Sequence, residues 1–259
     1  MKTAICIFGL FKELPRCIRS WKFLNHLNYD IYFSTYNYTY ERNTNLGINI
    51  FEEVTEQEIK DLFPSAQNIL INLENKDNNE LNSLHNSDKM LYHWKKCWSM
   101  LCDSGVIYDS VFLVRPDIIF ENSTEISLSN LDCSSEDIIY GGGVRQCPPP
   151  TYISTMDILT IGNPIAIGKI ITGMNFIYDY TKFFEYHLAK FLVNNDIYSV
   201  DLGNMDVIYA VVRSNSRELI NSNINGNFDG IFLNNIHLLT HRFSETVDEH
   251  IDRALPFRA

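Results

Sequence analysis

Charged side chains directly follow an apolar run near the middle of the chain. The run DSVFLV (109–114) leads straight into Arg115, Pro116 and Asp117. A carboxylate and a guanidinium just after a buried strand, with a proline fixing the turn, have the chemistry to hold a divalent cation and a diphosphate. The same two side chains could instead form a local ion pair that caps the strand. Residue types alone leave both interpretations open.

Polar or glycine residues also follow two earlier apolar runs, TAICIF (3–8) and YDIYFS (29–34). These residues are Gly9, Lys12, Arg16, Thr35 and Tyr36. Ligands of an open parallel sheet bind beyond the carboxyl ends of its strands. We therefore expect these residues and Asp117 to gather at one edge of a sheet.

Alternating apolar strands and amphipathic helices are predicted along the chain. We expect strands at 3–8, 29–34, 68–73, 109–114, 137–140, 157–161 and 231–239, and helices at 15–27, 52–62, 89–102, 164–186 in large part, and 205–214. Thr55, followed three residues later by Glu58, is a capping-box pattern that opens the second helix. The polar segment 74–88 is interpreted as a mobile surface loop. This alternation predicts an α/β fold in a single domain, with a mostly parallel central sheet flanked by helices.

Composition restricts the partners of this chain. Its 259 residues are 45% hydrophobic, enough for one large core, and its net charge of -11 repels nucleic acid and anionic membranes. An anionic ligand would need local compensation by a cation, by Arg or Lys, or by helix N-termini. The first apolar run is too short to span a bilayer, and six cysteines without a CxxC pair indicate reduced thiols. We expect a cytoplasmic protein without a transmembrane segment.

Three further side chains are candidates for chemistry. Asp206 begins a predicted helix, where it could deprotonate a hydroxyl within ~3 Å or simply stabilise the helix dipole. His241 follows the last apolar run, where a structural role is the alternative to a metal ligand. Lys95 lies on the predicted helix 89–102 and could face phosphates or solvent.

Five fragments of the chain, in order, resemble a group of small GT-A-type glycosyltransferases associated with surface polysaccharides and large DNA viruses. The fragments are TAICIFGLFKELPRCIRSW, NYDIYFSTYN, MLYHWKKCWSML, VFLVRPDIIF and DILTIGNPIAI. The resemblance implies a GT-A-like, Rossmann-related fold with a nucleotide-binding half, 1–120, and an acceptor- and sugar-binding half, 121–259. It also implies that the first strand and its loop bind the nucleotide through Phe8, Gly9, Lys12 and Arg16, with Thr35, Tyr36, Lys95 and Arg115 as further contacts.

In that group, the turn after the fourth strand holds the metal-binding DxD motif. The resemblance thus implies that Asp117 binds Mn²⁺ or Mg²⁺ together with the donor diphosphate, and that a late histidine, His241, adds a metal ligand. A full DxD would place a second carboxylate where this sequence has Arg115. Either one carboxylate suffices alongside other ligands, or the guanidinium replaces part of the metal's charge on the leaving diphosphate.

The implied reaction moves a sugar from a nucleoside-diphosphate sugar, a UDP- or GDP-sugar, to a hydroxyl of a glycan acceptor. Asp206 and Asp157 would be its catalytic carboxylates. By the resemblance, Asp157 lies where such enzymes contact the donor sugar or the acceptor. Its alternative role is that of a carboxylate at the start of a strand. Two other functions stay open. A sugar nucleotidyltransferase usually carries an early Gly-rich phosphate loop, which is not evident here. A non-catalytic carbohydrate- or nucleotide-binding module would agree with the incomplete DxD.

Overall fold

The centre of the protein is a seven-stranded sheet in the order β12-β8-β11-β6-β1-β2-β5. The computed structural model describes residues 1–43, 48–75, 77–121, 124–141, 145–146, 152–153, 158–175, 184–202, 207, 209–211 and 237–238. The strands are β1 (Lys2–Phe8), β2 (Asn28–Tyr36), β5 (Ile69–Glu74), β6 (Ser110–Val114), β8 (Ile138–Gly141), β11 (Leu159–Gly162) and β12 (Tyr198–Asp201). β11 runs antiparallel to both neighbours, and the other pairs are parallel. The predicted mostly parallel α/β sheet is confirmed.

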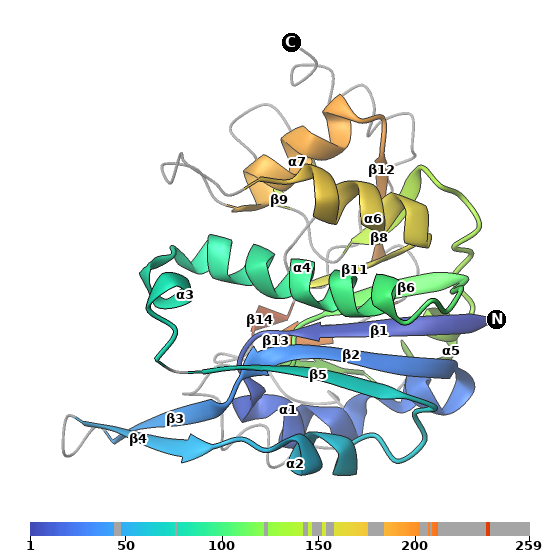
Figure 1. Cartoon of the computed structure of the whole chain (residues 1–259). Helices are drawn as coiled ribbons and strands as arrows, with labels where there is room; N and C mark the ends of the chain where they lie inside the picture. Colours follow the sequence, from blue (N-terminus) through green and yellow to red (C-terminus); the bar gives the residue numbers. More distant parts are fainter. Residues whose placement is uncertain are drawn as a thin grey trace.

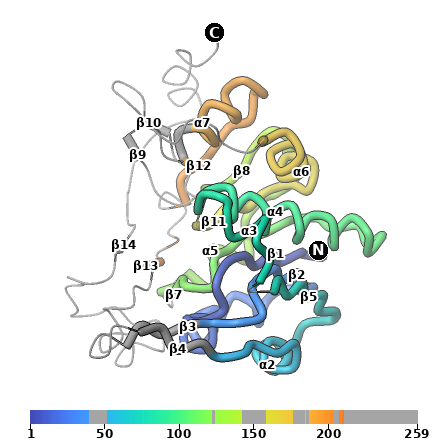
Figure 2. Tube along the Cα trace, turned by 60° about the vertical axis from the view of Figure 1, so that its left-hand side comes forward, coloured from blue at the N-terminus to red at the C-terminus, as the bar shows by residue number. Residues whose placement is uncertain are grey.

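Helices cover both faces of this sheet (Figure 1). On one face, α4 (Asn86–Asp103) lies across β1 and β2, and α6 (Pro164–Gly173) and α7 (Phe184–Asn194) follow beyond it. The short α1 (Leu14–Cys17) and α2 (Glu56–Asp61) lie on the other face, and Figure 2 shows α2 and α4 on opposite sides of the sheet. The flanking helices of the predicted fold class are therefore present.

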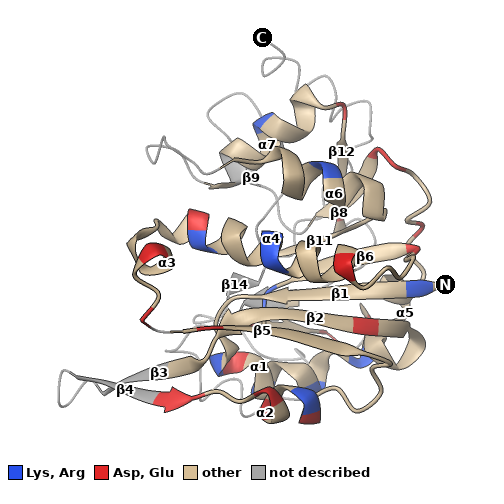
Figure 3. Cartoon of the chain, in the orientation of Figure 1, with Lys and Arg blue, Asp and Glu red and all other residues tan. Residues whose placement is uncertain are grey.

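Strand β1 is buried on both faces, as its continuous apolar run predicted. Ile5 and Ile7 belong to one hydrophobic cluster, whereas Ala4 and Cys6 belong to the cluster under α4. Charged residues lie mostly in helices and connecting segments, and the central strands carry few (Figure 3). Among the helices of the described residues, none combines the length and apolar character needed to cross a membrane.

The single helix predicted at 15–27 is wrong. The chain forms consecutive short turns instead, at Phe11–Glu13, α1, Ile18–Ser20 and Lys22–His26. The turns break at Trp21, whose ψ is 48° and whose Nε1 donates to the Ile118 carbonyl at 2.8 Å. Its ring packs against Phe23 and Phe120 at centroid distances of 6.1 and 5.9 Å. Tertiary packing of this indole outweighs the helical pattern of the segment.

The helix predicted at 205–214 is also wrong where the structure describes it. β13 (Tyr209–Val211) is a strand that pairs antiparallel with β7 (Ile118–Phe120) and with β14 (His237–Leu238). β14 agrees with the strand predicted at 231–239. The buried aromatic pair of Tyr209 and Phe120, with ring centroids 6.1 Å apart, favours the strand pairing over helix propensity.

Other differences concern the segments between strands. The predicted loop at 74–88 contains α3 (Asn79–Ser83) and the first turn of α4. The predicted helical stretch 164–186 is divided between α6 and α7, whereas α2 begins as predicted with the capping box of Thr55 and Glu58. Several elements were not predicted: β3 (Tyr38–Asn43), β4 (Ile48–Glu53), α5 (Thr124–Ser129), β7, β9 (Arg145–Gln146), β10 (Tyr152–Ile153) and β12.

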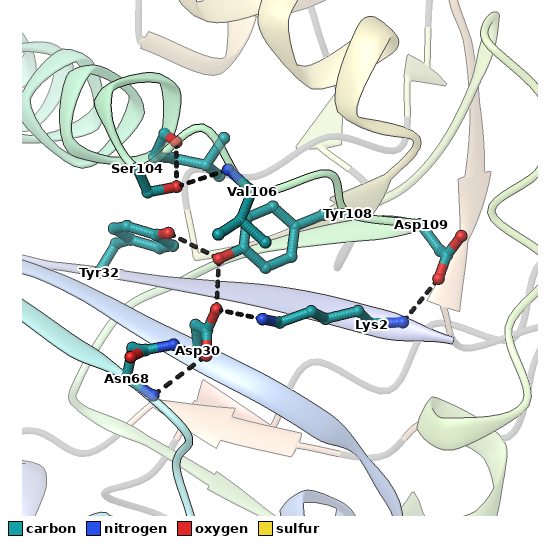
Figure 4. A network of polar contacts seen from close by, with 9 residues as sticks. Lys2, Asp30, Tyr32, Asn68, Ser104, Val106, Tyr108 and Asp109 are labelled. Carbon is teal, nitrogen blue, oxygen red and sulfur yellow. Dashed lines mark hydrogen bonds and ion pairs between the residues drawn. The ribbon is translucent and has the colours of Figure 1, made fainter.

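A buried polar network fastens the amino-terminal ends of β1 and β2 (Figure 4). Asp30, which is fully buried, accepts hydrogen bonds from Tyr108 at 2.5 Å and from Lys2 at 2.9 Å on Oδ2. Its Oδ1 accepts from the backbone and side-chain amides of Asn68, each at 3.1 Å. Burial raises the pKa of Asp30, but the bonds from Tyr108, Lys2 and Asn68 outweigh it and lower the pKa. This carboxylate is charged and structural.

Candidate functional site

A cleft of about 570 Å³ lies at the carboxyl ends of β1, β2 and β6. Within the sheet, β1 pairs with β2 along one edge and with β6 along its other edge. A crevice at such a switch point is where open α/β sheets bind ligands. In Figure 1 this edge of the sheet lies near α3 and the start of α4, and both helices contribute to the cleft.

The structure brings part of the predicted site together in this cleft. The predicted residues that line it are Phe8, Gly9, Lys12, Tyr36, Arg115 and Asp117. Arg16, Thr35 and Lys95 are described but do not line it. Asp157, Asp206 and His241 lie outside the described residues, as does Cys147. The cleft is therefore lined by six of the nine residues predicted to contact the nucleotide. The roles of all the predicted site residues stay predictions.

Gly9 closes the end of β1 in a conformation that glycine favours, with φ of +116°. Its amide donates to the Ser34 carbonyl at 3.2 Å, which ties it to β2. A Cβ on Gly9 would lie 3.5 Å from Pro116 Cδ, an ordinary contact distance, so the dihedral angle imposes the requirement for glycine. Gly9 thus joins the turn after β1 to the turn after β6.

Arg115 and Asp117 form a bidentate ion pair in the turn after β6. Arg115 Nε donates to Asp117 Oδ1 at 2.9 Å, and Nη2 donates to Oδ2 at 2.5 Å. Both oxygens of the predicted metal ligand are therefore engaged by a guanidinium. Within the described ranges, no three His, Cys, Asp or Glu side chains gather closely enough to hold a metal ion. In this arrangement, the described residues do not fit a divalent cation.

The cleft has a local excess of positive charge. Its ionic side chains are the cations Lys12, Lys89 and Arg115 and the carboxylates Glu13 and Asp117, which sum to +3 and -2. The chain as a whole carries -11. Asn86 and Ser87 from the first turn of the 18-residue α4 also line the cleft, so the positive end of a helix dipole faces it. This combination suits an anionic ligand.

Arg16 lies close to the cleft without lining it. Its Nη1 is 3.8 Å from Glu13 Oε2. Burial raises the pKa of the Cys17 thiol, the carboxylates of Asp117 and Glu13 raise it further, and Arg16 opposes them. The guanidinium of Arg16 therefore contributes to the electrostatics on this side of the site.

His93, on α4, was not predicted as a site residue from the sequence. Its side chain is 2% exposed and lines the cleft, with Nδ1 2.8 Å from Ser34 Oγ. Nε2 has no hydrogen-bond partner among the described residues. Burial lowers the pKa of His93 to about 4; Glu74 raises it and Lys96 lowers it. His93 is thus neutral near pH 7. Its position one helical turn after Met90, on the buried stripe of the predicted helix, was the available signal.

Aromatic side chains form the apolar part of the cleft. Phe8, Tyr36, Tyr38 and Phe184 all line it. The Tyr36 ring lies 5.1 Å from the His93 ring and 5.4 Å from the Tyr38 ring. Burial, with Tyr38 and Glu74 adding to it, raises the pKa of Tyr36 to about 12, so this phenol is neutral. A planar ligand group can pack on such rings.

Comparisons with known proteins give only distant similarities. No protein-family model and no curated protein matches this chain. The apo-form and a second structure of the glycosyltransferase GlyE of Streptococcus pneumoniae TIGR4 are each 12% identical, with TM-scores of 0.44 and 0.43. They cover 98% of this chain, which spans 60% of theirs.

A further similar structure belongs to a Bacillus anthracis protein assigned provisionally as a glucose-1-phosphate thymidylyltransferase and solved with sucrose. It is 10% identical, with a TM-score of 0.46, and the similarity covers 90% of this chain and 97% of that one. At these TM-scores, the similarities support no conclusion on activity.

Proposed function

We propose that this protein is a glycosyltransferase whose cleft binds a nucleoside-diphosphate sugar and delivers the sugar to a hydroxyl of a glycan or related acceptor. The observation that carries the proposal is the cationic cleft at the carboxyl ends of β1, β2 and β6 in a strongly acidic chain. Its volume of about 570 Å³ lies within the usual range for small-molecule sites. The sequence resemblance to small GT-A-type enzymes supports the same reading.

The cations of the cleft suit a diphosphate. Lys12 follows β1 and Arg115 follows β6, so the two approach the cleft from adjacent strands. Positive groups fixed where negative charge develops stabilise a departing diphosphate more than the bound ground state. We assign Lys12 and Arg115 to this role and Lys89 to the entry of the anionic donor. Aromatic packing by Tyr36 and Phe8 is assigned to the nucleoside.

The acceptor needs a base for its hydroxyl proton, and Asp206 and Asp157 are the proposed carboxylates. The assignment of Asp157 rests on the sequence resemblance, and that of Asp206 rests on its carboxylate alone. Mn²⁺ or Mg²⁺ at Asp117 and His241 is the alternative to Arg115 as the source of positive charge, and it requires Asp117 to leave its ion pair with Arg115. A bound divalent cation would add charge at the diphosphate. A cytoplasmic location completes the proposal, in keeping with the free thiols of the described cysteines.

The test is release of nucleoside diphosphate from a panel of UDP-, GDP-, CDP-, ADP- and dTDP-sugars, with a mixture of glycan acceptors and with buffer alone. We expect turnover with at least one donor, and its loss in Arg115→Ala. Lys169→Ala is the control, because Lys169 pairs with Asp137 on the exposed surface at 3.0 Å.

Two results would replace the proposal. Tight donor binding without any release of nucleoside diphosphate, with or without acceptor, would identify a non-catalytic binding module. Formation of a nucleotide sugar from a nucleoside triphosphate and a sugar phosphate, with pyrophosphate released, would identify a sugar nucleotidyltransferase.

A further inference from the structure

A chain of hydrogen bonds leads from a partly buried carboxylate to His93 in the cleft. Glu74 Oε1 accepts from Asn72 Nδ2 at 2.9 Å, and the same amide nitrogen donates to Ser34 Oγ at 3.2 Å. Ser34 Oγ lies 2.8 Å from His93 Nδ1. Ser34 is fully buried, and His93 is 2% exposed. The chain runs from the end of β5 through β2 to α4.

The carboxylate of Glu74 sets the direction of the bonds that Asn72 makes. Burial raises the pKa of Glu74, but bonds from Tyr92, Asn72 and Asn78, and the charge of Lys96, lower it below the ordinary value. An ionised carboxylate only accepts, so Asn72 turns its NH₂ toward Glu74 and therefore toward Ser34. Ser34 Oγ accepts one of those protons and has a single proton of its own. Donation of that proton to His93 Nδ1 makes the chain of bonds continuous from Glu74 to the imidazole.

With Nδ1 as the acceptor, the proton of the neutral ring resides on Nε2. Nε2 is buried, without a partner among the described residues, in a side chain that lines the cleft. A buried donor without an acceptor costs stability that a ligand recovers when it supplies one. A ligand in the cleft that reaches Nε2 would supply this acceptor.

We propose that His93 Nε2–H donates to the carbonyl oxygen at the 4 position of a pyrimidine or the 6 position of a purine, and so selects donors with uracil, thymine or guanine. This inference rests on the proposed function, because it assigns the base of the same nucleotide. Cytosine and adenine carry an amine at the corresponding position. An amine facing Nε2–H would leave two buried donors unpaired, which is the strongest form of discrimination that a binding site has.

The neighbours of His93 favour a base over a phosphate as its ligand. Tyr36 packs edge-on against the imidazole at 5.1 Å, and Tyr92 packs on it at 5.5 Å. The imidazole is neutral, and Glu74 is linked to it through Asn72 and Ser34. Lys12 and Arg115, which suit phosphates, come from the turns after β1 and β6, whereas His93 stands over β2. A neutral donor beside aromatic rings suits a carbonyl of a planar base.

The first test measures the affinities of UDP, GDP, CDP, ADP and inorganic pyrophosphate by calorimetric titration. We expect UDP or GDP to bind about tenfold or more tightly than both CDP and ADP. Equal binding of all four nucleotides would overturn the inference and leave the proposed function intact. Failure of these four nucleotides and of dTDP to bind would overturn the proposed function as well.

Variants then separate the role of the His93 N–H group from that of the rest of the site. His93→Leu should weaken the preferred nucleotide by about tenfold and leave pyrophosphate unchanged, whereas His93→Gln, which retains an N–H donor, should keep part of the preference. Equal losses of nucleotide and pyrophosphate in His93→Leu would assign His93 to the phosphates and contradict the inference. Lys169→Ala, on the exposed surface and outside the cleft lining, is the control.

Ser34 acts as a positioning residue, and nitrogen NMR of the free protein tests its role without any ligand. We expect the His93 ring as the Nε2–H tautomer at pH 7, and a mixture of tautomers with reduced base discrimination in Ser34→Ala. A wild-type ring with its proton on Nδ1 would refute the inference even if the protein transfers sugar.

Discussion

Asp117 presents both of its carboxylate oxygens to Arg115, at 2.9 Å from Nε and 2.5 Å from Nη2. The pair belongs to the turn that follows β6, and both residues line the cleft. Such a fork holds each side chain in one orientation, as a bidentate guanidinium contact does. By the sequence resemblance a second carboxylate would be expected at the position of Arg115, where this chain has a cation.

Replacement of Asp117 tests whether this pair belongs to the active site. In Asp117→Ala, we expect turnover to fall by about a hundredfold or more, because Arg115 loses the partner that orients it toward the diphosphate. The free energy of unfolding should change by only about 1 kcal/mol, since the pair is partly exposed. Initial rates and thermal unfolding measure the two effects. In the control Asp137→Ala, which breaks the exposed pair with Lys169, turnover should be normal; an active Asp117→Ala would remove the pair from the mechanism.

Chelation distinguishes the two sources of positive charge. Because Arg115 occupies both oxygens of Asp117, we expect turnover to persist in EDTA at about a tenth or more of its rate in Mn²⁺. Arg115→Ala should lose activity in either condition. Complete loss of wild-type activity in EDTA, with recovery on adding Mn²⁺ or Mg²⁺, would show that Asp117 exchanges Arg115 for a metal ion.

The network around Asp30 should stabilise the fold without affecting the cleft at the opposite ends of the strands. Tyr108→Phe removes the donor at 2.5 Å from Asp30 Oδ2, and we expect a loss of about 1–3 kcal/mol with nucleotide affinity unchanged. Urea unfolding measures the loss. Asp103→Asn alters an exposed carboxylate at the end of α4 and should change stability by less than about 0.5 kcal/mol.

Asp30 also predicts a pH dependence. Its pKa is lowered in the folded state, so its contribution is complete above the ordinary carboxyl pKa of about 4 and is lost as pH falls through the lowered value. The stability difference between the wild type and Asp30→Asn should therefore be constant at neutral pH and shrink in acid. A difference that grows in acid would contradict this assignment.

His93 predicts a second pH dependence, in a higher window. The unfolded imidazole gains a proton near pH 6.5, whereas the folded one stays neutral to about pH 4. The unfolded state therefore binds more protons in this window, and the wild type should lose up to about 3 kcal/mol relative to His93→Leu as pH falls through it. Urea unfolding of both proteins between these pH values measures the loss. Parallel stability curves would show that His93 is not held neutral.

The central strands were predictable because they are continuous apolar runs of strand length. β1, β6 and α4 agree with their predicted positions, and the capping box at Thr55 fixed the start of α2. The segment around Trp21 was not predictable, because the indole hydrogen bond to Ile118 joins residues far apart in the sequence. β13 was not predictable for the same reason, since its strand conformation depends on pairing with β7.

The site was predictable only in part. The carboxyl ends of three neighbouring strands place Gly9, Tyr36 and Asp117 in the cleft. The expectation that ligands bind beyond the carboxyl ends of parallel strands therefore predicted these residues. His93 and Lys89 were missed because residues on a helix reach the cleft only through the packing of α4 on β1 and β2. The polarity of the hydrogen-bond chain to His93 requires the three-dimensional order of its members.

Binding of the donor tests the central claim most directly. The measurement is calorimetric titration of the wild type and two variants with a panel of nucleoside-diphosphate sugars. The variants replace two lysines of α4: Lys89, which lines the cleft, and Lys95, which does not. We predict that at least one sugar nucleotide binds the wild type, that Lys89→Ala weakens it by about threefold to tenfold, and that Lys95→Ala leaves it unchanged. Absence of binding by every donor, or equal effects of the two substitutions, would contradict a donor site in this cleft.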